Sequence, residues 1–376
     1  MEKCKTKILI IQDHDPLDGV SSSVATFGVA SKLVSLGFIV DFVSPRTTQN
    51  KIQQGVNVIK LESIMALKSE ISGADVIIIV MNLSAFFKPL GLMSIDLCEQ
   101  LSKPCIPWVH TNITNSMFNA IAGVDDFSQK VSIEMLKNTL NKGICKKIVC
   151  VSKSAGCSLK TIGVDDNKCV VVFNGIDLQK ISDSIIDKKT VDIIFVGKFE
   201  PVKGVPFFLA AMKLVKEKFP KVKILMIGGG RDDEIVRSLI KVFNLETNVE
   251  VVPKLVNGKL LGSIASAKVL VSSSLSESFG LSIVEAMLLN TLVVVPNIEG
   301  PAEVINNGEC GFIYNSGDTG DAAEKVLEAL NLNNKKSCLL KRKAAIFAKD
   351  NFDLNKKTKE FVGLFPTQAE PKSLGG

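Results

Sequence analysis

The chain has 376 residues, of which 46% are hydrophobic and 22% charged, a composition typical of a globular protein long enough for two domains. Its net charge of +6 suits a small anionic ligand, but it falls short of a dense basic face, and one Trp and one Tyr leave few stacking residues. These counts argue against nucleic acid binding. The nine cysteines form no Cys-x-x-Cys pair, which argues against a disulfide framework and a zinc site.

Short β-branched runs alternate with longer helical patterns through the first half of the chain. Helices are expected at 21–35 and 130–141, and strands at 7–11, 38–43, 56–61, 75–81, 105–110, 147–151 and 169–173. Because these strands are apolar along their whole length, we expect a parallel sheet that helices cover on both faces.

The pattern stops at the polar segment "NGIDLQKISDSIIDKKT", which carries turn signals and which we interpret as the interdomain linker. It then restarts, with further strands expected at 191–197, 223–227, 249–252, 268–272, 292–295 and 311–314. The expected fold is therefore α/β, with two doubly wound Rossmann-like domains that bind ligands at the carboxyl ends of their strands. The limits that we expect are a first domain at 1–180, a linker at 181–190, a second domain at 191–350, a terminal helix at 351–365 that packs back toward the first domain, and a disordered tail at 366–376.

No segment of the sequence predicts a signal peptide or a membrane span. The most apolar window, 76–87, has about twelve residues, whereas a bilayer needs ~20. We therefore expect a cytoplasmic protein. The lysines from Lys130 to Lys147 leave peripheral contact with the inner face of a membrane open, although the apolar residues between them fit an ordinary amphipathic core helix equally well.

The segment "SESFGLSIVEAM" places two glutamates around an expected loop-to-helix junction. The backbone amides of Phe279, Gly280 and Leu281 would be unpaired donors at the positive end of the helix, where they suit phosphate or sugar oxygens. Glu285 falls about one turn into the helix among apolar neighbours, and a buried carboxylate there needs hydrogen-bond donors, which ligand hydroxyls would supply. The alternative is that Glu277 and Glu285 simply reach solvent, and the residues alone do not decide between the two.

This spacing, with "SFGL" after the first glutamate and "EAM" at the second, resembles the signature of retaining GT-B glycosyltransferases of the large family 4 type. The likeness spans nearly the whole chain and is most specific from about 195 to 315. The other segments that resemble the family, in the same order, are "VCVSKSAGCSLKTIGVDDNKCVVVFNGID", "FVGKFEPVKGVPFFLAAM", "MIGGG" and "GPAEVINNGECGFIY". The resemblance implies the GT-B architecture, two Rossmann-like domains facing across a cleft.

The resemblance also implies a role for each matching residue of the second domain. Glu285 would hold the ribose hydroxyls of a nucleotide, Glu277 would face the hydroxyls of the donor sugar, and the amides at 279–281 would contact sugar and phosphate. Lys198 and Lys203 would clamp the diphosphate and stabilise the leaving nucleoside diphosphate. The family usually has Arg where Lys198 stands, and Lys lacks the planar fork of Arg. The alternative is two ordinary surface lysines.

Three further positions are weaker candidates. His110 ends the strand "PCIPWVH", and the resemblance implies a place beside the donor sugar; the alternative is a structural histidine. Gly19, in the first strand-to-helix loop, would let that loop pack against diphosphate and sugar, although the family commonly has two glycines there and Asp18 precedes only one. Gly229 and Gly230 most simply form a turn, with the lining of the nucleotide pocket as a further role.

Together these features predict a retaining glycosyltransferase that moves a hexose-type sugar from a UDP- or GDP-sugar to a hydroxyl acceptor, a glycan, glycolipid or protein. Cell-envelope glycan or glycolipid synthesis is one setting for such a reaction. The catalytic group would be His110, Glu277, Lys198 and Lys203. No cofactor is expected, since the nucleotide sugar is a substrate, and no metal is expected, since Lys198 and Lys203 would supply the cations in its place. Two alternatives stay open: a non-catalytic GT-B protein that binds a nucleotide sugar or a partner subunit, and a nucleotide-sugar epimerase.

Overall fold

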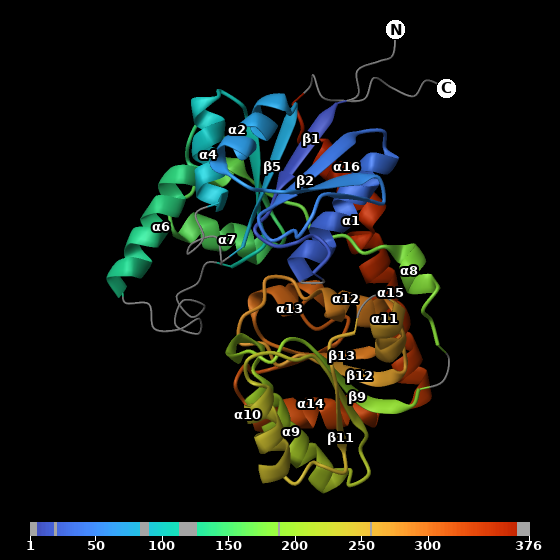
Figure 1. Cartoon of the computed structure of the whole chain (residues 1–376). Coiled ribbons are helices and arrows are strands. Elements are labelled where there is room, and N and C mark those ends of the chain that lie inside the picture. Colours follow the sequence, from blue (N-terminus) through green and yellow to red (C-terminus); the bar gives the residue numbers. More distant parts are fainter. Residues whose placement is uncertain are drawn as a thin grey trace. The chain divides into compact units, whose positions relative to one another are not determined.

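The computed structural model describes residues 6–18, 21–82, 90–112, 126–186, 189–255 and 258–366. The described residues divide into two compact units (Figure 1). Unit 1 holds the residues up to Ile176 and again from Leu354, whereas Asp177–Asp353 form unit 2. The chain therefore leaves unit 1 slightly before the expected limit at 180, and it returns after 353.

Unit 1 is a parallel α/β unit with one antiparallel edge. Its helices are α1 (Ser21–Ser35), α2 (Ile64–Gly73), α4 (Leu90–Gln100), α6 (Asp126–Leu140), α7 (Lys153–Thr161) and α16 (Leu354–Val362). Its strands are β1 (Lys7–Ile11), β2 (Ile39–Ser44), β3 (Lys51–Gln53), β4 (Val56–Lys60), β5 (Val76–Met81), β6 (Cys105–Val109), β7 (Ile148–Cys150) and β8 (Cys169–Val171). They form an eight-stranded sheet in the order β3-β4-β2-β1-β5-β6-β7-β8, in which only β3 and β4 pair antiparallel.

Helices cover both faces of this sheet, as the apolar strand pattern predicts. On one face Leu9 and Ile11 of β1 join a buried cluster with side chains of α2, α4, α6 and α7. On the other face Trp108 of β6 packs against Phe361 of α16, with ring centroids 4.7 Å apart. Figure 1 shows α1 and α16 to one side of these strands and α2, α4 and α7 to the other. The short edge strand β3 is an addition that the sequence pattern did not predict.

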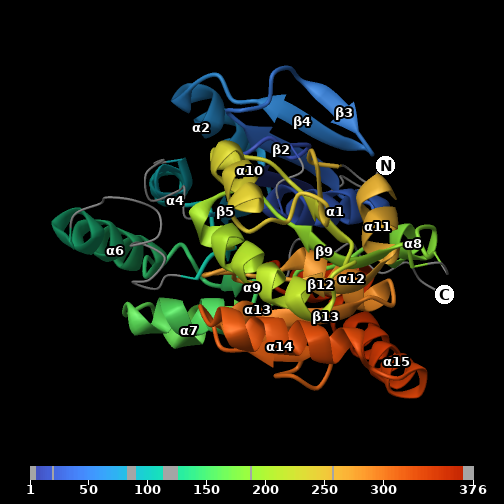
Figure 2. The same ribbon diagram turned by 90° about the horizontal axis from the view of Figure 1, so that it is seen from below.

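Unit 2 repeats the arrangement with parallel strands alone. Its helices are α8 (Leu178–Ser182), α9 (Val205–Lys218), α10 (Asp233–Val242), α11 (Gly258–Ala265), α12 (Leu281–Leu288), α13 (Glu299–Val304), α14 (Thr319–Leu330) and α15 (Asn334–Phe352). Its strands are β9 (Val191–Val196), β10 (Ile224–Ile227), β11 (Val249–Val252), β12 (Ala267–Val271), β13 (Leu292–Pro296) and β14 (Phe312–Tyr314). The order in the six-stranded sheet is β11-β10-β9-β12-β13-β14, and Figure 2 shows α9 and α14 side by side beneath these strands.

Each sheet has one point where the strand order reverses. In unit 1 the reversal lies between β1 and β5, and in unit 2 between β9 and β12. Connections leave such a pair of strands toward opposite faces, so that their carboxyl ends open a crevice where ligands of this fold class bind. The loops after β9 and β12, and those after β1 and β5, are therefore the places to examine for function.

The chain passes from unit 2 back to unit 1 at Asp353, whose extended backbone separates α15 from α16. The backbone amide of Leu354 donates to the carbonyl of Ile176, 3.0 Å away. A Cβ on Gly175 would lie only 2.6 Å from the Cα of Leu354, so glycine is required for this close approach. Helix α16 is thereby fixed onto the sheet of unit 1, against α1.

Candidate functional site

The loops after β9 and β12 in unit 2 are tied together at the point where the strand order reverses. Lys203 ends a short 3₁₀ turn, and Gly204 follows with a left-handed backbone, φ +60°. A Cβ on Gly204 would lie 2.1 Å from the carbonyl oxygen of Ser273. The hydroxyl of Ser273 in turn donates to the carbonyl of Lys203, at 2.8 Å. These contacts hold the Lys203 backbone in one position relative to the second loop.

Lys203 and Glu277, two of the predicted site residues, are paired with each other. The Lys203 ammonium donates to Oε2 of Glu277, and the two side chains are 25% and 21% exposed. A pair this accessible is screened by water and contributes little to stability. The pair places one cation and one carboxylate side by side at the point where the strand order of the sheet reverses.

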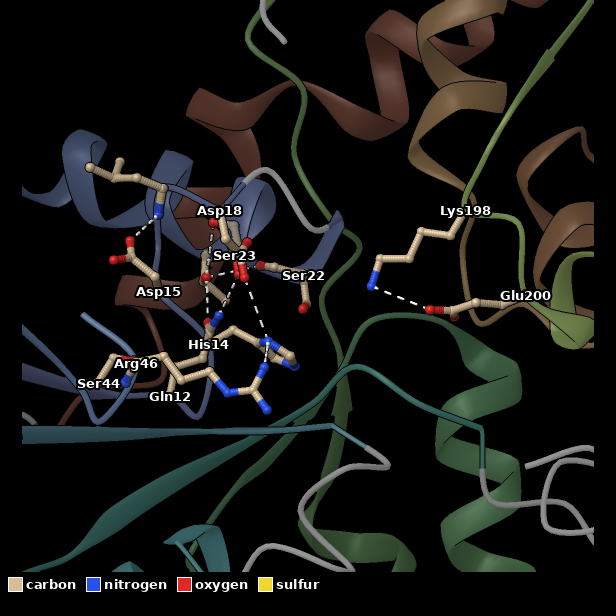
Figure 3. A network of polar contacts seen from close by, with 12 residues as sticks. Gln12, His14, Asp15, Asp18, Ser22, Ser23, Ser44, Arg46, Lys198 and Glu200 are labelled. Carbon is tan, nitrogen blue, oxygen red and sulfur yellow. Dashed lines mark hydrogen bonds and ion pairs between the residues drawn. The ribbon is translucent and has the colours of Figure 1, made fainter. Parts of the chain in front are cut away.

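Lys198, the other predicted cation, is in a different environment. Its side chain is exposed, and its ammonium lies 3.8 Å from a carboxylate oxygen of Glu200 (Figure 3). The backbone amide of Glu200 donates to the carbonyl of Lys198, so the two residues form one local turn. Lys198 is thus free to reorient, whereas Lys203 is anchored.

Helix α12 begins at the predicted junction. Gly280 caps it with φ +90°, and a Cβ there would meet Ile283 at 2.7 Å, so a side chain at this position would collide. Phe279 is buried and its ring meets Phe352 edge-on, with centroids 5.3 Å apart. No side chain caps the helix among the described residues, and the amide of Ile283 already donates to the carbonyl of Gly280, so the amides left for an acceptor atom are those of Leu281 and Ser282.

Glu285 lies one turn into α12, and its neighbours Val284 and Ala286 are fully buried. Burial raises the pKa of Glu285 from its ordinary value of 4.5 to about 7. Among the described residues neither a cation nor a hydrogen-bond donor offsets this cost. The carboxyl group that the sequence singled out is therefore held in an apolar helix without a partner of its own.

The glycine run after β10 has a packing explanation. A Cβ on Gly228 or Gly230 would lie 1.9 Å or 2.7 Å from backbone oxygens of the segment after β9, so both must be glycine. The amide of Gly230 donates to Asp233 at 2.7 Å, which closes the turn. Gly229 has room for a side chain, and its carbonyl accepts from the amide of Phe199. These contacts account for the run without a ligand.

In unit 1, His110 follows β6 directly. Its amide donates to the carbonyl of Met81, so His110 lies in register beside Asn82, the residue that follows β5. Its ring packs on Trp108 with centroids 4.8 Å apart, and burial lowers its pKa to about 3, so the imidazole is neutral at pH 7. His110 Nε2 and Asn82 Nδ2 are buried and have no hydrogen-bond partner within the described part of the chain. Sequence reasoning missed Asn82, although it ends an apolar strand as His110 does.

The loop after β1 carries a charged cluster that the sequence did not predict as a unit. Arg46 Nη1 lies 3.3 Å from Nδ1 of His14, and Oδ2 of Asp18 lies 3.5 Å from the same nitrogen (Figure 3). One ring nitrogen cannot both accept from Arg46 and donate to Asp18, so the two contacts are alternatives, and whether Nδ1 carries a hydrogen decides between them. Burial raises the pKa of the neighbouring Asp13. The predicted Gly19 lies outside the described residues.

The lysines around α6 are partly neutralised. Lys142 lies 2.7 Å from Asp96 and 2.6 Å from Glu99, and Lys137 lies 2.6 Å from Glu134. Among the described residues, no three His, Cys, Asp or Glu side chains gather as a metal site would require. None of the described helices is both long and apolar enough to cross a membrane.

Solved structures define the class of fold. A glycosyltransferase from Rickettsia africae aligns with a TM-score of 0.76 and 20% identity over 98% of this chain and 100% of that one. Anabaena HepE in complex with UDP and glucose aligns with a TM-score of 0.77 and 16% identity over 95% and 98% of the two chains. The GT-B fold predicted from the sequence is confirmed.

The match to a family model lies within unit 2. Residues 178–345 match the model of the family described as glycosyl transferases group 1. An uncharacterized glycosyltransferase of Methanocaldococcus jannaschii is 24% identical over 252 residues, 64% of each protein. A phosphatidyl-myo-inositol mannosyltransferase of Mycolicibacterium smegmatis is 27% identical over 178 residues, 46% of this chain and 45% of that protein. The matches thus span less than two thirds of these relatives.

Proposed function

We propose that the protein is a retaining glycosyltransferase that takes a sugar from a nucleotide-diphosphate sugar and holds this donor in unit 2. The observation that carries the proposal is the Lys203–Glu277 pair at the order reversal of the sheet, with the unpaired Glu285 in the adjoining helix. The family match of residues 178–345 supports it, as do the UDP and UDP-glucose complexes of the structural neighbour HepE.

In this proposal the ion pair opens when the donor binds. The diphosphate replaces Glu277 as the partner of Lys203, since charge-assisted bonds to phosphate are strong. Glu277 is then free to accept hydrogen bonds from hydroxyls of the donor sugar. Because the Lys203 backbone is tied to the loop after β12 by Ser273, its ammonium needs to turn only at the side chain. Lys198 can leave Glu200 and add a second cation.

Glu285 binds the ribose in this proposal. Two ribose hydroxyls would donate to its carboxylate and supply the hydrogen bonds that the apolar surroundings withhold. The first amides of α12, at Gly280 and Leu281, would donate to sugar and phosphate oxygens at the positive end of the helix. Ligand binding would then favour the charged form of Glu285, whose pKa is about 7 without it.

The transfer step needs no nucleophilic side chain. The bond between the sugar's anomeric carbon and the diphosphate oxygen breaks, and a bond to the acceptor hydroxyl forms on the same face. The acceptor's proton passes to the leaving phosphate, and Lys203 stabilises the charge that develops there. In unit 1 the neutral His110 has an Nε2 without a partner among the described residues, which suits a hydroxyl group of a ligand bound by that unit.

Thermal stabilisation by UDP, GDP and ADP tests the donor site and identifies the base. A nucleotide at a hundred times its dissociation constant adds about 2.7 kcal/mol, which raises the melting temperature of a unit of this size by about 5–10 °C. The variants Lys203→Ala and Glu285→Gln should lose this shift. Lys221→Ala removes an exposed lysine of the same unit and is the control. An unchanged shift in both site variants would contradict the assignment.

Product analysis separates the proposal from its alternatives. A retaining transferase yields a glycoside with the anomeric configuration of the donor, which the proton coupling at the anomeric carbon reports. A non-catalytic binder would show the thermal shift without donor turnover under any acceptor. An epimerase would convert the donor sugar with no acceptor present. Inversion of the anomeric centre would refute the retaining mechanism and leave the donor site intact.

A further inference from the structure

Helix α15 presents two different long faces. Ala344, Ala348 and Phe352 recur every fourth residue and are buried. They lie on the side from which α15 packs against α12. The residues of the opposite side are exposed, and α15 itself lies at the outside of unit 2 in both views (Figures 1 and 2).

Two large apolar side chains project from this outer side. Leu339 is 70% exposed and Ile346 is 52% exposed. They are seven residues apart, which is two turns of helix, so they stand one behind the other along its length. Two aliphatic side chains exposed to this degree contribute little hydrophobic stabilisation to the folded state, because their apolar surface stays in water.

Basic residues flank the pair on both sides. Successive residues are turned by 100° around the helix axis. On one side of the Leu339–Ile346 line stand Lys335, Arg342 and Lys349, and on the other side stand Lys336 and Lys343. Lys343 lies 2.8 Å from Glu309. No ion pair is found for the other four basic residues within the described part of the chain. One acidic residue, Asp350, lies on the same side of the helix.

We call the exposed side of α15 the α15 face. It consists of eight residues: Lys335, Lys336, Leu339, Arg342, Lys343, Ile346, Lys349 and Asp350.

The α15 face differs from the lysine-rich region that the sequence suggested for membrane contact. In that region Lys142 bridges two carboxylates and Lys137 pairs with Glu134, so much of the positive charge is compensated. On the α15 face the charge is largely uncompensated and surrounds exposed apolar side chains. An apolar centre within a basic rim is the pattern of a helix that lies in the interface of an anionic bilayer.

We propose that the α15 face docks on the surface of an anionic phospholipid membrane. The aliphatic pair enters the boundary between headgroups and acyl chains, and the basic rim faces the phosphates. The helix has 19 residues, about 28 Å at 1.5 Å per residue, and lies parallel to the surface. Nucleic acid would match the basic rim and leave the aliphatic pair in water, so lipid is the partner that satisfies both. This inference is independent of the proposed glycosyl transfer.

Vesicle co-sedimentation of the full chain tests the proposal. The vesicles are phosphatidylcholine alone and phosphatidylcholine mixed with phosphatidylglycerol, at low and high ionic strength. We expect binding to the mixed vesicles only, weakened by salt. One basic residue near an anionic surface raises the partition coefficient about fivefold, so Arg342→Gln with Lys349→Gln should lower it at least about tenfold. Leu339→Gln with Ile346→Gln should lower it to a similar degree.

Matched controls come from the same unit. Lys218→Gln with Lys221→Gln removes two exposed charges elsewhere, and Ile235→Gln with Val242→Gln removes an exposed apolar pair, also seven residues apart, from α10. Both should stay within about twofold of the parent chain, and all four variants should melt as the parent does. Equal losses in the controls, full binding by both α15 variants, or no binding to anionic vesicles would overturn the proposal. So would binding to a DNA duplex without binding to vesicles.

Discussion

Glu285→Gln tests whether the α12 carboxyl is buried without a partner, because the change keeps the shape of the side chain and removes its titration. The folded protein holds the pKa of Glu285 at about 7, whereas the unfolded chain has the ordinary value of 4.5. Below pH 4.5 the group is neutral in both states and costs nothing. Between pH 4.5 and about 7 the unfolded chain ionises while the folded chain keeps its proton, so the folded state loses stability as the pH rises, and above 7 the loss is complete.

The size of the effect follows from the two pKa values. Their separation, from 4.5 to about 7, corresponds to about 3 kcal/mol, and the partial exposure of Glu285 makes this an upper value. Glu285→Gln should therefore gain stability over the parent chain between pH 4.5 and pH 8, by about 2–3 kcal/mol. The same substitution should weaken nucleotide binding, so stability and ligand affinity should move in opposite directions.

Urea unfolding at the two pH values measures the difference, and the chain carries its own reporters. The single Trp, Trp108, lies in unit 1, and the single Tyr, Tyr314, lies buried in unit 2. If the two units unfold separately, the gain in stability of Glu285→Gln should raise the urea midpoint followed by Tyr314 fluorescence. The midpoint followed by Trp108 fluorescence should stay unchanged. A stability difference between variant and parent that does not change with pH would refute the reasoning, since it would mean that Glu285 ionises normally in the folded protein.

Three further outcomes are expected. Glu277→Gln frees Lys203 from its partner, so UDP alone should bind several-fold more tightly by calorimetry while sugar transfer falls; weaker UDP binding would contradict the proposed exchange of partners. Gly204→Ala should cost at least about 2 kcal/mol in urea unfolding, because the backbone is left-handed and the new Cβ would meet a carbonyl oxygen at 2.1 Å. Its control is Gly258→Ala, where a Cβ meets nothing within 4 Å and little change is expected. Phe361→Ala should cost about 3–5 kcal/mol and alter the fluorescence of Trp108, on which the ring packs; an unchanged emission would contradict the packing of α16 on β6.

The fold was predictable because its pattern is local. Apolar runs such as 8–11 and Val76–Met81, bounded by polar residues and too short for helices, indicate central strands of a sheet covered on both faces. The start of α12 was predictable too, since Gly280 stands directly before an apolar run. The edge strand β3 was missed because its three residues, two of them exposed, carry no apolar pattern.

The arrangement of the site was less accessible to sequence reasoning. That Lys203 and Glu277 contact each other depends on a strand order in which β9 and β12 are neighbours, and residues 74 apart give no local signal of it. Arg46 was missed for the same reason, whereas Asn82 did carry a local signal, since it directly follows the apolar strand β5. Both residues lie at the edge of the unit 1 sheet where the parallel strands end. Which residues lie beside them there depends on the pairing of the strands and not on the local sequence.

Unit 1 is built from two segments of the chain, one before and one after unit 2, and this has a consequence for folding during synthesis. Among the described residues, unit 2 is the continuous segment Asp177–Asp353 and can complete its core as soon as Asp353 has left the ribosome. Unit 1 cannot, because α16, which covers Trp108, is made after the whole of unit 2. Until α16 emerges, Trp108 lacks its partner Phe361, so unit 1 begins synthesis before unit 2 and completes its core after it.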